Sequence, residues 1–296
     1  MFDIRAWNNE NAATGAGRSQ HLRVFDKNIT SLSFPNSTRT DYNKEIPLSR
    51  ADTSIVILSS LIPTHPAITM INDTFNSLSM LEGLPSNTPI FISVDGLRAQ
   101  DLNTNNLEKL QNYTENLRER FQENPHVAIL NNPSFGHLSN GIRRALKMVN
   151  TEFVYIIQHD FKFIKHVNHR LLLKSMREYP GELQIVRFSK RPTTAGYVRP
   201  DCRKVVEYNG IRFTSGRWSD NNHLTTKRYY DEHLKIIGPK SRPVEAPMMR
   251  GATTAGTNCT TYHPYVYSQE LGPFLAHLDG RNTKPVSSAT EVEVLD

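Results

Sequence analysis

The chain has 296 residues, of which 38% are hydrophobic and 22% charged, the composition of an ordinary globular protein with ample core. Lys plus Arg number 35 against 29 Asp plus Glu, and this small, dispersed surplus favours an anionic small ligand and excludes a nucleic-acid groove. No stretch approaches the length of a membrane-spanning helix, so no membrane span is expected.

The two cysteines, Cys202 and Cys259, define neither a disulfide framework nor a metal spacing. The first residues lack the basic and apolar regions of a signal peptide, so we expect a cytoplasmic protein. Residues 1–50 form a polar leader that we expect to pack on or beside the domain. Within it, only residues 21–25 have the pattern of an edge strand.

Strand and helix patterns then alternate along the chain up to residue 164. Buried strands are expected at residues 54–58, 89–94, 127–130 and 153–157, and helices at 68–81, 105–122 and 136–149. This alternation predicts βαβ units and a parallel sheet. Right-handed crossovers place the carboxyl ends of the strands on one edge. We therefore expect Pro63, Thr64, Asp95 and the run Gln158-His159-Asp160 to converge on one crevice.

The second half of the chain is less regular. We expect a strand at residues 183–188, a strand or hairpin arm at 210–219 and an extended segment at 262–267. A helix is expected at residues 223–234, with Thr225 or Thr226 near its start, and a loop that opens a helix at 243–249.

Three features suit a nucleotide-sugar site, and each also has a structural explanation. Asp95 can accept hydrogen bonds from a base or ribose, or form an Asp-Gly turn. The helix that opens at Gly136, with Asn140 and Arg143, offers amides and a guanidinium to a diphosphate, or is an ordinary surface helix. Asp160 supplies a hard oxygen for a divalent ion that bridges two phosphates, or caps a turn.

Residues 55–164 resemble the nucleotide-binding half of a GT-A glycosyltransferase of the kind grouped around the family 2 enzymes. The first strand and loop of that family are similar to ILSSLIPTHP, and the second strand with its nucleoside-binding Asp to FISVDG. The segment before the metal-binding strand resembles LNNPSFGHLSNGIRRAL, and Asp-x-Asp is replaced by the last three residues of YIIQHD. The chain is also similar to compact soluble transferases found in large DNA viruses of algae.

The resemblance implies an α/β fold of the GT-A type: Rossmann-like, with a mostly parallel central sheet flanked by helices and a less regular, acceptor-side C-terminal half. We expect one continuous domain. Its nucleotide-sugar-binding half spans residues 51–165, its acceptor-binding and catalytic half spans 166–285, and a polar tail spans 286–296.

The resemblance also implies transfer of a sugar from a nucleotide diphosphate sugar, UDP-linked, to a glycan, glycoprotein or other hydroxyl acceptor. The expected donor-binding residues lie at the strand ends and on the following helix: Pro63, Thr64, Asp95, Asn140, Arg143, His159 and Asp160. Because Asp160 is the one carboxylate left of the family motif, it would hold Mn²⁺ or Mg²⁺. A late histidine would complete the metal shell, with His277 the candidate and His263 its rival, although a lone histidine is more often structural.

If transfer inverts the anomeric centre, one carboxylate must act as general base. By analogy with GT-A enzymes, order along the chain favours Glu245, and Asp220 is the competitor. The structural alternative is a first-turn residue of a helix for Glu245 and a helix N-cap or turn residue for Asp220. Trp218 and His223, beside Asp220, would form an acceptor-binding platform. The alternative to an enzyme is a non-catalytic protein that binds nucleotide sugars or glycans on a degenerate GT-A scaffold. The loop SSLIPTHP lacks the glycine pattern of a dinucleotide-dependent dehydrogenase and the Gly-rich basic loop of a nucleotidyltransferase.

Overall fold

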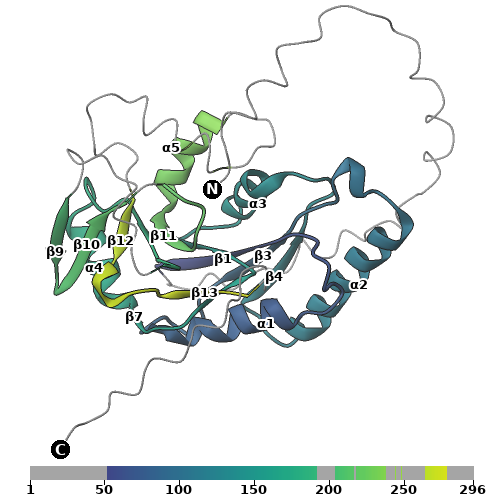
Figure 1. Cartoon of the computed structure of the whole chain (residues 1–296), viewed down its shortest axis with the longest axis horizontal. Helices are drawn as coiled ribbons and strands as arrows, with labels where there is room; N and C mark the ends of the chain where they lie inside the picture. Colours follow the sequence, from purple (N-terminus) through teal and green to yellow (C-terminus); the bar gives the residue numbers. More distant parts are fainter. Residues whose placement is uncertain are drawn as a thin grey trace, which may run out of the picture. The chain divides into compact units, whose positions relative to one another are not determined.

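The computed structural model describes residues 52–191, 204–216, 218–237, 244, 248 and 264–278 (Figure 1). All of these residues belong to one compact unit, Lys44–Asp296. The edge strand expected at residues 21–25, the polar tail and both cysteines lie outside the described residues, as does most of the segment 243–249.

A nine-stranded sheet forms the centre of this unit, with the order β4-β3-β1-β5-β11-β8-β12-β10-β9. Strands β10 and β11 run opposite to the other seven, so the sheet is mostly parallel. The strands are β1 (Thr53–Ser59), β3 (Ile90–Val94), β4 (Val127–Asn131), β5 (Phe153–Gln158), β8 (Ile185–Arg187), β9 (Val205–Tyr208), β10 (Ile211–Ser215), β11 (His223–Thr226) and β12 (Tyr265–Tyr267).

Two further sheets have two strands each and are built from short segments beside the main sheet. In one, β13 pairs antiparallel with β6, and in the other, β2 pairs parallel with β7. Their bounds are β2 (Leu81–Glu82), β6 (Phe161–Phe163), β7 (Val167–Asn168) and β13 (Leu275–His277).

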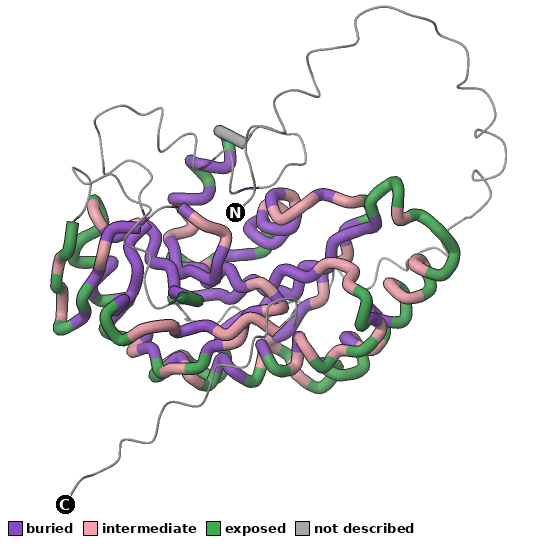
Figure 2. The backbone as a smooth tube through the Cα atoms, in the orientation of Figure 1, coloured by how far each residue is buried: buried purple, intermediate pink, exposed green. Residues whose placement is uncertain are grey.

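Strand β1 is buried along its whole length, as a run of β-branched and aliphatic residues covered on both faces should be (Figure 2). Ile55 and Ile57 enter one core cluster, whereas Val56 and Leu58 enter another. This alternation follows from the period of two residues in a strand. The sheet therefore separates two cores, one on each face.

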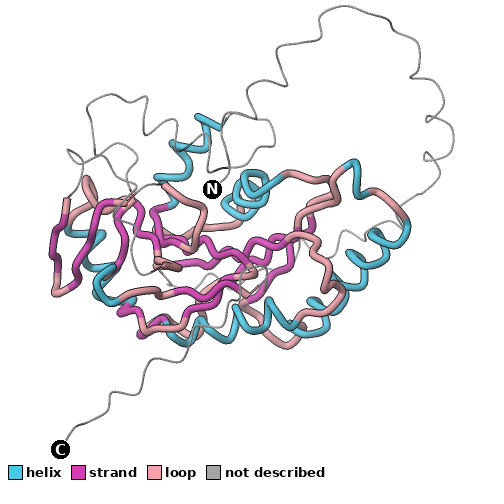
Figure 3. The backbone as a smooth tube through the Cα atoms, in the orientation of Figure 1, coloured by secondary structure: helices cyan, strands magenta, loops and turns pink. Residues whose placement is uncertain are grey.

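Helices cover both faces of the sheet (Figures 1 and 3). Helices α1, α2 and α4 contribute to the first core cluster, and α3 and α5 to the second. The α-helices are α1 (Thr69–Asn76), α2 (Thr104–Phe121), α3 (His137–Leu146), α4 (His169–Glu178) and α5 (Lys227–Ile237), and the short 3₁₀ helices are Ser77–Met80, Ala99–Asp101 and Gln269–Leu271.

The predicted α/β architecture, a mostly parallel central sheet flanked by helices, is confirmed. The expected strands and helices of residues 54–157 are present, with ends shifted by a few residues. The division into halves at residue 165 and the tail boundary stay predictions. In the part of the chain that the structure describes, we find no helix long and apolar enough to cross a membrane.

The helix expected at residues 223–234 is wrong at its start, because the first four residues form β11 and the helix begins at Lys227. β-Branched Thr225 and Thr226 favour the strand, which lies between β5 and β8. The Thr226 hydroxyl then accepts a hydrogen bond from the Tyr229 amide at 3.1 Å, which caps the helix. Helix α4 was not predicted, although Leu172, Leu173 and Met176 give it a buried side.

His169, the first residue of α4, leads to a prediction about pH. Its ring is 2% exposed and shares a hydrogen bond of 3.1 Å with the Tyr155 hydroxyl, and burial lowers its pKa from 6.5 to about 4. Below pH 6.5 the unfolded chain therefore binds a proton that the folded chain does not. The contribution of His169 to the free energy of unfolding is therefore fully present above pH 6.5. It is lost as the pH falls towards 4, by at most about 1.4 kcal/mol per pH unit.

We expect His169→Gln to make the free energy of unfolding less dependent on pH between 6.5 and 4, measured by urea denaturation at several pH values. Lys174→Gln, on the exposed side of the same helix, serves as the control and should leave the slope unchanged. An equal slope for His169→Gln and the wild type would contradict this account.

Candidate functional site

The carboxyl ends of four parallel strands meet at one edge of the sheet, which we call the carboxyl edge. Ser59 is paired with Val94, Val94 with Asn131, and Leu58 with Gln158. Asp95 follows Val94 directly, and His159 and Asp160 follow Gln158. The strand ends that carry the predicted site thus lie side by side, at the edge where ligands bind in open α/β sheets.

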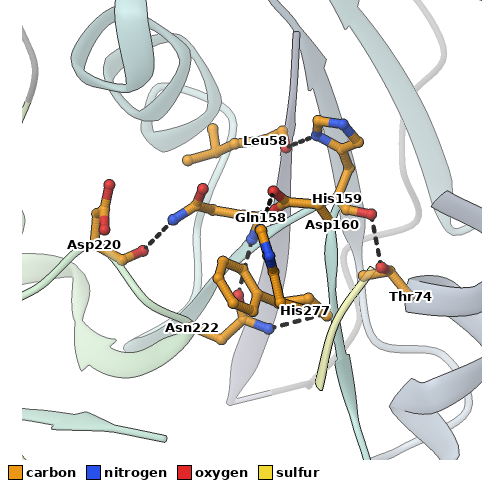
Figure 4. A network of polar contacts seen from close by, with 9 residues as sticks. Leu58, Thr74, Gln158, His159, Asp160, Asp220, Asn222 and His277 are labelled. Carbon is orange, nitrogen blue, oxygen red and sulfur yellow. Dashed lines mark hydrogen bonds and ion pairs between the residues drawn. The ribbon is translucent and has the colours of Figure 1, made fainter. Parts of the chain in front are cut away.

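A buried amide holds the turn that carries Asp160 (Figure 4). Asn222, which is 0% exposed, lies just before β11 and opposite the end of β5. Its Oδ1 accepts a hydrogen bond of 2.9 Å from the Gln158 amide, and its Nδ2 donates one of 3.2 Å to the Phe161 carbonyl. Both ends of the turn between β5 and β6 are therefore fixed by a single side chain.

Asp160 and His277 are in contact, although they are 117 positions apart in the chain. Strand β13 pairs with β6 so that His277 lies opposite Phe161, next to Asp160. His277 Nε2 is 3.0 Å from Asp160 Oδ2 (Figure 4). The other oxygen, Oδ1, is buried and has no hydrogen-bond partner among the described residues. Such an atom is where an ion, a water or a ligand is expected.

A second carboxyl group, Asp220, belongs to the same cluster. Its backbone carbonyl accepts a hydrogen bond of 2.7 Å from Gln158 Nε2. Burial raises the pKa of the Asp220 carboxyl, the nearby charge of Lys190 opposes that shift, and the charge of Asp160 adds to it. A carboxylate with raised proton affinity suits a general base. The amide of Gln158, which stands at the first position of the family's Asp-x-Asp, is thus engaged with the backbone.

His159 points into the protein, away from Asp160 (Figure 4). Its Nδ1 shares a hydrogen bond of 3.1 Å with the Leu58 carbonyl, and its own carbonyl accepts one of 2.8 Å from the Thr74 hydroxyl. Because a carbonyl only accepts, Nδ1 carries the proton and Nε2 is an acceptor. Nε2 is buried and has no partner among the described residues, and burial lowers the pKa of the ring. Donor binding by His159 stays a prediction.

The loop after β1 exposes Pro63 and Thr64 and buries the residue that follows them. His65 stacks on Tyr113 of α2 with ring centres 3.7 Å apart, and Tyr113 shares a hydrogen bond of 2.8 Å with Ser59. Burial, aided by the charge of His159, lowers the pKa of His65 to about 3, so this ring is neutral. The loop is therefore anchored to α2, which holds Pro63 and Thr64 at the surface.

Asp95 ties the end of β3 to the start of α3. Its Oδ1 accepts hydrogen bonds from the Gly96 amide at 3.1 Å and from the Gly136 amide at 2.8 Å. Burial nevertheless raises the pKa of this carboxyl. The Asp-Gly turn is thus present, and binding of a nucleoside by Asp95 stays a prediction.

Asn140 and Arg143, both on α3, contact each other, and Arg143 also contacts α5. Arg143 Nη1 donates a hydrogen bond of 3.3 Å to Asn140 Oδ1, and Nη2 donates one of 3.0 Å to the Leu234 carbonyl. Burial lowers the pKa of the guanidinium. These contacts join the two helices on one face of the sheet, and a role in binding the diphosphate stays a prediction.

Trp218 and His223 are packed in the interior, each 1% exposed. His223 uses both ring nitrogens, with the Asn221 carbonyl and the Tyr230 hydroxyl each 2.7 Å away, and burial lowers its pKa to about 4. In the described structure neither ring is exposed enough for a sugar to stack on it, and acceptor binding by Trp218 and His223 stays a prediction. Glu245 and His263 lie outside the described residues.

The metal site implied by the resemblance can be tested on the donor atoms. In the described ranges, no three His, Cys, Asp or Glu side chains form a group that could hold a metal ion. Asp160 Oδ2 and His277 Nε2, 3.0 Å apart, are at hydrogen-bond distance from each other, and both atoms are of the types that hold a divalent ion. Metal binding by this pair stays a prediction.

Comparisons with known proteins give no family for the chain. No family model matches it, and no curated protein matches it. Solved structures similar to it include S. aureus TarS residues 1–349, with 11% identity over 72% of this chain and 57% of that one and a TM-score of 0.40. Another is the mannosyltransferase PcManGT from Pyrobaculum calidifontis in complex with GDP-Man and Mn²⁺, with 9% identity, 69% and 52% coverage and a TM-score of 0.40.

A third is CMP:2-keto-3-deoxy-manno-octonic acid synthetase complexed with CTP, with 14% identity, 73% and 89% coverage and a TM-score of 0.41. The chain spans just over half the length of the TarS fragment and the mannosyltransferase. Similarities this distant carry no functional conclusion.

Sequence reasoning missed Asn222. It stands beside a second asparagine in a short polar run, and nothing in that run distinguishes the one whose amide faces β5. Its place depends on which strands neighbour β5, and that order is set by the whole sheet. The sequence favours a solvated basic loop for Lys190 and Arg191, with a role in holding the diphosphate as the alternative, and that role stays a prediction.

Replacement of Asn222 should weaken both the fold and the site. We expect Asn222→Ala to lower the free energy of unfolding by about 2–4 kcal/mol, because two hydrogen bonds are lost and the Gln158 amide and Phe161 carbonyl stay buried without partners. Urea denaturation measures this. Asn116→Ala, which removes a half-buried hydrogen bond to Pro66, serves as the control and should cost about 1 kcal/mol. Equal losses would contradict the role of Asn222.

Proposed function

We propose that the chain is a glycosyltransferase that moves a sugar from a nucleotide diphosphate sugar, UDP-linked, to a hydroxyl group of a glycan or glycoprotein, with inversion at the anomeric carbon. The observation that carries the proposal is the pair Asp160–His277 at the carboxyl end of the central strand, with one carboxylate oxygen that has no hydrogen-bond partner among the described residues. The resemblance of residues 55–164 to family 2 GT-A enzymes supports the same reading, and membership of that family belongs to the proposal.

In this proposal the donor lies along the carboxyl edge. Pro63 and Thr64 contact it from the loop after β1, Asp95 and the start of α3 contact the nucleoside and diphosphate, and Asp160 with His277 holds Mn²⁺ or Mg²⁺. When bound, the metal ion neutralises charge on the leaving diphosphate. The protein side chains fix the donor so that one face of its anomeric carbon is open to the acceptor.

Asp220 is the proposed base among the described residues. It stands before β11, next to the end of β5, and its raised pKa lets it take the proton of the acceptor hydroxyl as the new bond forms. The leaving group is the nucleoside diphosphate, on the opposite face of the sugar. Glu245 is the rival base.

A non-catalytic protein that binds nucleotide sugars or glycans on the same scaffold is the second candidate. The observation that favours it is Gln158, a neutral amide at the first position of Asp-x-Asp, held by the Asp220 carbonyl. This arrangement removes one metal ligand and keeps the rest of the edge intact, so it permits binding without turnover.

Titration with a panel of UDP- and GDP-sugars in Mn²⁺, combined with a donor-hydrolysis assay, separates the candidates. We expect Asp160→Asn to weaken binding at least tenfold, because the metal loses its carboxylate ligand. Asp220→Asn should leave the affinity for the nucleotide sugar unchanged. It should lower the rate of donor hydrolysis by about 10²–10⁴-fold, the usual contribution of a general base. Asp231→Asn, on the exposed surface of α5, serves as the control and should change neither.

Binding without hydrolysis by the wild type would favour the non-catalytic protein. A wild type that binds none of these nucleotide sugars would contradict both candidates. Full hydrolysis by Asp220→Asn, with loss in Glu245→Gln, would transfer the role of base to Glu245.

A further inference from the structure

Lys190 follows a backbone segment that is hydrogen-bonded to two other segments of the carboxyl edge. It follows β8, and the residue before it, Ser189, accepts backbone hydrogen bonds from Phe274 at 2.8 Å and Leu275 at 3.0 Å. The Phe188 amide donates to the Asn222 carbonyl at 2.9 Å. The backbone that leads to Lys190 is therefore fixed to the segment before β11 and to the start of β13, the two segments that supply Asp220 and His277.

The side chain of Lys190 lies over the site. Its Nζ is 4.8 Å from the centre of the Phe161 ring, which is a cation–π distance. Phe161 follows Asp160 directly, and its ring is 4.7 Å from that of His277, centre to centre. Lys190 as a whole is exposed, so its ammonium stays open to a ligand. Lys165, which follows β6, is by contrast held at the Leu271 carbonyl.

The two carboxyl groups of the site, Asp160 and Asp220, disfavour a bound diphosphate unless a cation lies near it. Burial and, to a lesser extent, the charge of Asp160 raise the pKa of Asp220, and the charge of Lys190 opposes that shift. A diphosphate adds further negative charge, which the two carboxylates repel. Gln158 reduces the repulsion, because its neutral amide stands where a third carboxylate would be.

We propose that Lys190 is a diphosphate-binding residue of this site, and that it lets the nucleotide bind without a divalent ion. This inference rests on the proposed function and deepens it. The ammonium contacts the phosphate oxygens from above the Phe161 ring, on the side of the site formed by β8 and β13. Asp160 and His277 hold a metal ion that strengthens binding but is not required for it. Lys190 acts in binding and moves no proton.

The test is calorimetric titration with UDP and with inorganic pyrophosphate, each in EDTA and in Mn²⁺. Pyrophosphate probes the phosphate site whatever the base of the natural donor. We expect wild-type protein to bind both probes in EDTA. Lys190→Met should bind them at least tenfold more weakly there, and Lys190→Arg, which keeps the charge, should bind them close to wild type.

Two further variants complete the design. Lys174→Met is the control, because Lys174 is an exposed lysine of α4 far from the proposed site. With Asp52 it lines a hollow at the opposite edge of the sheet. This variant should bind both probes as wild type does. Asp160→Asn should bind no more weakly than wild type in EDTA, because it removes a repelling charge, and should lose most of the gain that Mn²⁺ gives. The affinity in EDTA is then assigned to Lys190, and the additional affinity in Mn²⁺ is assigned to Asp160.

The inference is overturned if wild type binds these probes only with Mn²⁺, or if Lys190→Met binds as wild type does in EDTA. In either case the proposed function stands, because nucleotide binding at Asp160 is retained. If wild type binds neither UDP nor any nucleotide sugar of the panel under either condition, the proposed function fails, and the role of Lys190 fails with it.

Discussion

The candidate site depends on the way Asn222 bridges β5, β6 and the segment before β11. With no charge of its own, this buried amide satisfies the Gln158 amide and the Phe161 carbonyl, which the turn at Asp160 would otherwise leave unpaired. The bridge requires β11 to run antiparallel beside β5, and β11 brings Asp220 to the same place. Hydrogen bonds of the fold thus hold the segment that carries Asp220 beside the turn that carries Asp160.

Electrostatics at this edge is a balance between burial and a few cations. Burial raises the pKa of Asp95 and Asp220 and lowers that of His65 and His159, so the edge favours neutral groups unless a partner is present. Asp160 has His277 as its partner, and Asp220 has Lys190 nearby.

Local pattern predicted most of residues 54–157, because β1 and β5 are continuous apolar runs and α2 has a regular helical periodicity, and neither signal depends on distant neighbours. His277, the candidate that the family resemblance gave for the metal shell, contacts Asp160, and its role as a metal ligand stays a prediction. The pattern failed at the start of β11, where the pairing with β5 and β8 outweighs helical spacing. Trp218 and His223, expected as an acceptor platform, are buried in the described structure. Asn222 could not be found, because its role arises from strand order rather than from its sequence neighbours.

The most direct test of the central claim, that a nucleotide binds at Asp160 and His277, is a histidine side-chain NMR titration. The chain is labelled with ¹⁵N-histidine, the His277 signal is assigned with His277→Gln, and Mn²⁺ is added in the presence of UDP. Because Mn²⁺ is paramagnetic, we expect the His277 signal to broaden first, while His126, before the amino end of β4, stays sharp. A His277 signal that stays sharp while Mn²⁺ and UDP saturate the protein would contradict the account.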